Sequence, residues 1–121
     1  MGNKTYGFSR RKRLQNPDFQ SVFKEPIKNH SSYFTVLARE NGKNIPRLGA
    51  VVSKRNVRNA VQRNLIRRLM RESFRLNQEK LKGFDVVVIL RREVWQRTHD
   101  KTPNECLEKH WRQLAMLNKK L

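Results

Sequence analysis

Apolar positions near the start of the chain recur at helical spacing. Phe19, Val22 and Phe23 would share one face of a helix. Asn16 can cap this helix, and Pro17 suits the first helical position, where its missing N–H costs nothing. The pattern therefore predicts a first helix shortly after residue 16.

Three further apolar segments have the character of β-strands. Residues 33–38 and 48–53 are separated by a polar turn that contains Asn41-Gly42, which predicts a hairpin between them. Residues 84–90 form an almost continuous β-branched run, typical of a strand covered on both faces. A short edge strand around residues 27–30 is the least strongly signalled element.

Two longer helices are predicted in the second half of the chain. Residues 57–78 show helical periodicity, and their inward side should carry Val61, Leu65, Ile66, Leu69 and Met70. A capping-box sequence at residues 102–105 opens a last helix that extends to about residue 117. The expected inward positions of this helix are Leu107, Trp111 and Leu114.

The order of elements is helix, two or three strands, long helix, strand, helix. This order predicts an α+β fold, a compact two-layer sandwich with helices packed on one sheet. We expect one domain over residues 1–121, and its residues 1–14 should form a basic, loosely held arm.

The net charge of the chain indicates a binding function in addition to the fold. The chain carries 28 Lys and Arg against 10 Asp and Glu, a formal net charge of +18, which favours a polyanionic partner. No run approaches the ~20 apolar residues that span a bilayer, so nucleic acid is favoured over membrane. The single cysteine, Cys106, fits a reducing cytoplasm and is expected to be a small buried residue.

An arginine row distinguishes the long predicted helix. Arg63, Arg67, Arg71 and Arg75 follow at i, i+4 steps, with Glu72 as the only nearby acid. A solvated helix face usually mixes signs, because like charges at this spacing destabilise a helix by ~0.2–0.5 kcal/mol per pair. Since the planar guanidinium grips phosphate in two places, the row favours an RNA-facing surface over a merely solvated one.

The same segment resembles a known family. Residues 63–71, RNLIRRLMR, are similar to the arginine–asparagine–arginine signature of the bacterial ribonuclease P protein, and residues 49–57 resemble the strand and crossover that lead into it. The likeness extends from about Arg13 to Leu117. Two departures from the family pattern are Leu65, where the signature has its second arginine, and Arg67, where lysine is common.

The resemblance implies a four-stranded mixed sheet and a left-handed β-α-β crossover, although ordinary crossovers are right-handed. It implies a protein subunit that binds the catalytic ribonuclease P RNA and the single-stranded 5′ leader of precursor tRNA, with Mg²⁺ positioned mainly by the RNA. By this resemblance, the residues expected to bind the RNA subunit are Lys54, Arg55, Asn56, Arg63, Asn64, Arg67, Arg68 and Arg71. The residues expected to line the leader cleft are Arg13, Phe19, Phe23, Tyr33 and Leu37.

Aromatic rings suit a cleft of this kind, because unpaired bases stack on them without sequence preference. Phe19 and Phe23 could equally be core residues at i, i+4 spacing. Some relatives have tyrosine at the position of Leu37; Tyr33 would compensate only if it shared the same sheet face, which a spacing of four residues allows.

We expect no catalytic or metal site on this chain and no small-molecule substrate. His30, His99 and His110 lack metal-ligand spacing, and the acids form no cluster for two-metal hydrolysis. The alternative is a ribosomal or other structural RNA-binding protein, which net charge alone does not separate from the first reading. A protein-only nuclease and a DNA-binding module are less favoured, the latter because no helix-turn-helix pair is recognisable.

Overall fold

The computed structural model describes residues 13–14, 20, 22–24, 26–31, 33–91 and 103–120. Residues 20 and 22–24 are helical, where the sequence predicts the first helix. Phe19 and the predicted capping residues of that helix, Asn16 and Pro17, lie outside the described residues. The other elements are β1 (Ile27–His30), β2 (Phe34–Glu40), β3 (Arg47–Val51), α2 (Ala60–Leu76), the 3-10 turn η2 (Gln78–Leu81), β4 (Phe84–Leu90) and α3 (Pro103–Lys120).

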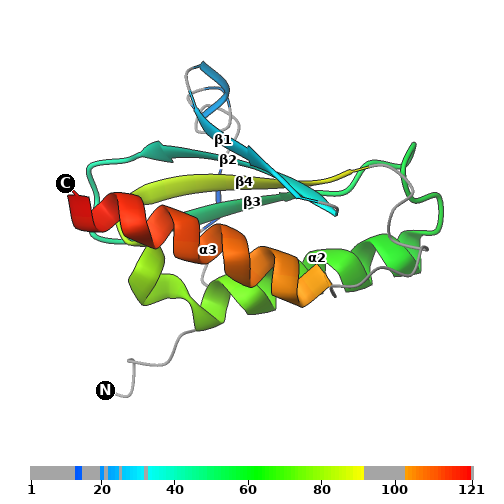
Figure 1. The fold of residues 1–121 in the computed structure, drawn as a ribbon. Helices are drawn as coiled ribbons and strands as arrows, with labels where there is room; N and C mark the ends of the chain where they lie inside the picture. The colour runs from blue at the N-terminus through cyan, green and yellow to red at the C-terminus, as the bar shows by residue number, and fades with distance from the viewer. Residues whose placement is uncertain are drawn as a thin grey trace, which may run out of the picture.

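The four strands form one mixed sheet in the order β1-β2-β4-β3 (Figure 1). β4 pairs antiparallel with β2 and parallel with β3. The predicted hairpin is therefore wrong, because β4 lies between β2 and β3. The Asn-Gly sequence does make a turn, with Gly42 at a φ of 67°. A turn fixes where the chain reverses, however, and the apolar β4 gains most from a central place in the sheet.

The segment from β3 through α2 to β4 joins two neighbouring parallel strands. In Figure 1 the chain leaves the right-hand end of β3, returns leftward through α2 in front of the sheet, and enters β4 above β3. This crossover is left-handed, as the family resemblance implies and unlike the ordinary right-handed unit. It places α2 beside β3 and α3 on the same face of the sheet.

The larger part of the core lies between the two helices and one face of the sheet. Trp111 of α3 is fully buried there; its Nε1 donates to Ser73 Oγ at 2.8 Å, and its ring meets Phe74 edge-on at 6.1 Å between centroids. Each large apolar side chain buried in this way contributes roughly 1.5–3 kcal/mol. The predicted inward positions of the last helix are confirmed, because Leu107, Trp111 and Leu114 are all buried. Cys106 is also buried, as expected.

A smaller cluster covers the opposite face of the sheet. Its buried members are Leu14, Val22, Leu37 and Val87, with Val51 and Ile89 partly buried against them. Val22 belongs to the helical residues 22–24, so the first helix lies on this face. β4 is therefore covered on both sides, as its β-branched run predicts.

The inward face of α2 differs from the prediction. Ile66 and Met70 are fully buried, but Val61 is 67% and Leu65 53% exposed. At ~100° per residue, Val61 and Leu65 lie on the side of the helix opposite to the buried Met70 and Phe74. The buried positions instead continue to Phe74, which rotates the inward face toward the arginine row.

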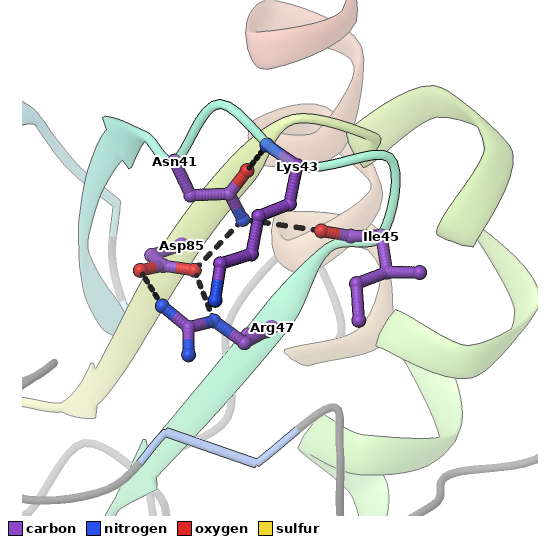
Figure 2. A network of polar contacts seen from close by, with 5 residues as sticks. All are labelled: Asn41, Lys43, Ile45, Arg47 and Asp85. Carbon is purple, nitrogen blue, oxygen red and sulfur yellow. Dashed lines mark hydrogen bonds and ion pairs between the residues drawn. The ribbon is translucent and has the colours of Figure 1, made fainter.

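A polar network ties the β2–β3 connection to the start of β4. Figure 2 shows Arg47 and Asp85 side by side on neighbouring strands; Arg47 Nε and Nη2 donate to the two carboxylate oxygens of Asp85 at 2.8 and 2.7 Å. Asn41 Nδ2 donates to Asp85 Oδ1 at 2.9 Å and to the carbonyl of Ile45 at 3.1 Å. The carboxylate thus fixes the path of the loop that passes the start of β4.

Candidate RNA-binding surface

The arginine row begins at a capped helix end. Asn59 precedes α2, and its side-chain oxygen accepts a hydrogen bond from the backbone N–H of Gln62 at 3.0 Å. This cap satisfies one of the free N–H groups of the first turn. From there the row climbs α2 along the border between its buried and exposed faces, and all four of its members are half-buried: Arg63, Arg67, Arg71 and Arg75.

Arg63 holds the loop before the helix. Its Nη1 donates to the carbonyl oxygens of Val57 at 2.9 Å and Arg58 at 2.8 Å. Since these bonds connect α2 to residues 57 and 58, they fix how the crossover loop enters the helix. The side chain of Arg58, which sequence reasoning did not single out, is exposed, and its backbone is held by Arg63.

Asn56 has a comparable role at the other end of the loop. Its Nδ2 donates to the carbonyl oxygen of Leu90 at 3.1 Å, and its backbone N–H lies within hydrogen-bonding distance of Ser53 Oγ and of the Ser53 carbonyl, 3.2 Å in each case. The neighbouring side chains of Lys54 and Arg55 are exposed. Asn56 therefore fastens the loop to the end of β4 while the two cations project from it.

Arg67 lies where α2 meets the end of β3. Its Nη1 donates to Asn64 Oδ1 at 3.0 Å, and its Nη2 reaches the carbonyl of Val52 at 3.4 Å. Asn64 and Arg68 are exposed on the outer side of the helix. The guanidinium of Arg67 is thus held by two groups of the fold and keeps a fixed orientation at the surface.

The electrostatic environment changes along the row. Burial lowers the pKa of Arg71, and the positive charges of Arg13 and Arg67 lower it further. One turn later the direction of the shift reverses, because the hydrogen bond that Arg75 donates to the Glu72 carboxylate raises the pKa of Arg75 and lowers the pKa of Glu72. Arg71 thus lies near other cations, whereas Arg75 is paired with an acid.

The predicted leader-cleft residues do not come together on one surface. Phe23 is 51% exposed, but Leu37 is buried beneath Val22 in the smaller cluster. Tyr33 is buried in the larger cluster with Phe34, so the expectation that it shares a face with Leu37 is wrong. Tyr33 precedes β2, where strict strand alternation no longer applies. Phe19 lies outside the described residues.

Polar groups that sequence reasoning missed border Leu37 on the first-helix face. In the β1–β2 register Lys28 pairs with Leu37 and His30 with Thr35, so these side chains share that face. His30 Nδ1 and Thr35 Oγ1 lie 2.9 Å apart. The alternation within β1 could have indicated them, but its four residues gave too short a pattern.

Neither metal ligation nor membrane insertion is evident in the part of the chain that the structure describes. No group of three His, Cys, Asp or Glu side chains there could hold a metal ion. None of the helices in that part is both long and apolar enough to cross a membrane. Together, the four-stranded mixed sheet and the arginine-lined α2 define a small basic α+β protein with a surface suited to a polyanion.

Comparisons with known proteins assign this architecture to one family. The family described as Ribonuclease P matches residues 8–115. A protein of Pseudomonas putida strain GB-1 named ribonuclease P protein component is 44% identical over 110 residues, covering 89% of this chain and 81% of that protein. The structure of the RNase P protein from Thermotoga maritima is 38% identical with a TM-score of 0.74, covering 85% of this chain and 97% of that one. The RNase P protein of Staphylococcus aureus is 28% identical with a TM-score of 0.69, covering 89% and 95%.

The chain belongs to the ribonuclease P protein family. Its function is that of a protein component of ribonuclease P, the ribonucleoprotein endonuclease that matures the 5′ end of tRNA. An RNA partner, the ribonuclease P RNA, follows from this membership.

Proposed function

We propose that the chain binds its RNA subunit through α2 and the crossover loop, and binds the 5′ leader of precursor tRNA on the first-helix face of the sheet. The observation that carries the first part is the arginine row, which α2 holds half-buried and fixed by bonds to the Val57, Arg58 and Val52 carbonyls. Rigid guanidinium groups suit bidentate phosphate binding. The proposed RNA-binding residues are Lys54, Arg55, Asn56, Arg63, Asn64, Arg67, Arg68 and Arg71.

For the leader, the exposed ring of Phe23 supports the proposal. An unpaired base can stack on such a ring for ~1–3 kcal/mol, and the exposed Lys28 on the same sheet face as Leu37 can contact the backbone. Leu37 would act beneath this surface, as part of the support for the first helix. Phe19 remains a proposed member on the basis of family resemblance.

Cleavage itself is proposed to belong to the RNA subunit, which would position Mg²⁺ in the cytoplasmic holoenzyme. Within the part of the chain that the structure describes, no three His, Cys, Asp or Glu side chains come together as metal ligands. The protein would bind and orient the leader, and its positive surface would reduce the repulsion between phosphates of the two RNAs.

Reconstitution tests the proposal. The chain is mixed with the ribonuclease P RNA of the same organism, and 5′-leader cleavage is measured at low Mg²⁺. We expect strong stimulation by the protein, and a loss of stimulation with the charge-removing variant Arg67→Ala. Absence of stimulation, with recovery of ribosomal RNA from pulldowns, would instead support a structural RNA-binding role.

A matched pair of variants tests the leader surface. Phe23→Ala should weaken holoenzyme binding to precursor tRNA by about fivefold to a hundredfold, while binding of mature tRNA is unchanged. Met116→Ala is the control, because Met116 is a comparably exposed apolar residue on α3. Equal losses for both tRNAs would place Phe23 outside the leader site.

A further inference from the structure

Arg13 lies on the sheet beyond β3. It forms an isolated parallel bridge with Leu48, and the backbone N–H of Leu14 donates to the Leu48 carbonyl at 3.1 Å. Residues 13 and 14 thus extend the sheet by one short strand-like segment at its β3 edge. The side chain of Arg13 is exposed, whereas that of Leu14 is buried.

Sheet geometry decides to which face Arg13 belongs. Residues directly opposite each other on neighbouring strands point to the same face, and successive residues point to opposite faces. Leu48 lies in the larger cluster with Ile66 and Met70 of α2. Leu14 lies in the smaller cluster beneath the first helix. Both observations place Arg13 on the α2 face, opposite the face of Leu37.

On that face, α2 presents two arginines toward the same edge. Arg67 reaches the Val52 carbonyl just after β3, and Arg71 follows one turn later on the same side of the helix. Arg13 and Arg67 are also close enough to Arg71 for their positive charges to lower its pKa. Three guanidinium groups from two separate segments of the chain therefore converge where α2 packs over the β3 edge.

We propose that Arg13, Arg67 and Arg71 form a composite site for backbone phosphates of the RNA subunit, so that Arg13 belongs to the RNA-subunit surface and not to the leader cleft. The proposal rests on the proposed function of α2. Like charges brought together by the fold repel each other, and a phosphodiester between them removes that repulsion while accepting bidentate hydrogen bonds. The Leu14–Leu48 hydrogen bond fixes the backbone next to Arg13, so the pairing of residues 13 and 14 with β3 completes the site.

The test is equilibrium binding of the full chain to the transcribed ribonuclease P RNA of the same organism over a range of salt concentrations. Arg13→Ala, Arg71→Ala and the double variant are compared with wild type. Each single variant should raise Kd about tenfold and lower the salt slope by about 0.7–0.9 per lost phosphate contact. The double variant should lose less than the product of the two single effects, because the two arginines share one site. Arg13→Lys should recover only part of the loss.

Lys109→Ala is the charge-matched control, because Lys109 is an exposed cation that belongs to α3 and not to α2 or the β3 edge. It should leave Kd for the RNA subunit within about twofold of wild type, and thermal unfolding confirms that each variant is folded.

If Arg71→Ala weakens binding and Arg13→Ala does not, the composite site is overturned while the proposed function stands. If Arg13→Ala weakens only the binding of leader-bearing tRNA by the holoenzyme, Arg13 returns to the leader cleft. If wild-type protein does not bind the RNA subunit, the proposed function itself fails.

Discussion

Asn56 is half-buried and fastens the crossover loop, which we propose to bind the RNA subunit, to the rest of the fold. Its amide donates to the Leu90 carbonyl at the end of β4 and holds the loop that carries Lys54 and Arg55. Asn56→Ala should lower the free energy of unfolding by about 1–2 kcal/mol, the cost of a lost hydrogen bond with a partly buried acceptor left behind. It should also weaken RNA-subunit binding, because the two cations lose their fixed support.

Comparison with Asn64→Ala separates the two effects. Asn64 is exposed and bonds only Arg67 among the contacts found, so its removal should leave chemical denaturation nearly unchanged. If Asn56→Ala left stability unchanged and still weakened binding, direct contact with RNA would be the better account of Asn56.

His110 makes stability depend on pH. The side chain is 3% exposed, and neither ring nitrogen has a hydrogen-bond partner among the described residues. Burial first, then the charges of Lys109 and His30, lower its pKa to about 4. The unfolded chain, with an ordinary histidine pKa near 6.5, takes up the proton first. Stability should therefore fall as pH drops below about 6.5, and this contribution should level off below about pH 4.

The His110→Leu variant measures this contribution directly. Urea denaturation of wild type should show a loss of roughly 1–2 kcal/mol between pH 7 and pH 4.5 beyond that of the variant, allowing for partial solvent screening. Other carboxylates titrate in both proteins, so only the difference between them reports on His110. Parallel pH profiles would contradict a buried neutral imidazole.

At the scale of elements, α2 carries an exposed leucine where the family signature has its second arginine. Leu65 is 53% exposed, so Leu65→Arg removes little buried apolar surface and should change stability by less than about 0.5 kcal/mol. It should strengthen RNA-subunit binding and steepen the salt dependence by about one phosphate contact, or 0.7–0.9 in slope. Binding titrations at several salt concentrations measure both effects, with Leu76→Arg, equally exposed at the far end of α2, as the control.

The same element shows how far the sequence could predict the structure. Strand 84–90 was predicted with its observed bounds, since a β-branched run has few alternatives. Helical periodicity located α2 and its arginine row, but it did not show which side of the helix is covered, so it placed Val61 and Leu65 inward. Periodicity reports the spacing of apolar residues along one helix, whereas exposure depends on which side the neighbouring elements cover.

Local sequence patterns could not predict the order of the strands in the sheet or the sheet faces on which Arg13 and Tyr33 lie. The turn at Gly42 indicated a reversal, but the insertion of β4 depends on contacts distant in sequence. Arg13 is assigned to a face only through its pairing with Leu48. Charge and motif thus located the arginine row on α2, whereas the faces on which Arg13, Tyr33 and Leu37 lie follow only from the sheet.

At the scale of the whole molecule, the Arg47–Asp85 pair holds the sheet together where β3, β4 and the β2–β3 loop meet. Their side chains are 13% and 7% exposed, and Asn41 adds a third donor to the carboxylate. Asp85→Ala leaves the half-buried Arg47 charge without this partner, and breaking such a pair costs about 3–5 kcal/mol. We expect a loss of about 3 kcal/mol in the free energy of unfolding, measured by chemical denaturation.

The Arg47→Met, Asp85→Leu double variant should recover much of that loss, because an apolar pair can fill the same space. Binding of the RNA subunit by the folded double variant should equal that of wild type, since Arg47 shares the face of Asp85 and Val87 and not that of α2. A double variant that folds well and still binds the RNA subunit more weakly would show that Arg47 contributes its charge to the RNA interface as well as to the fold.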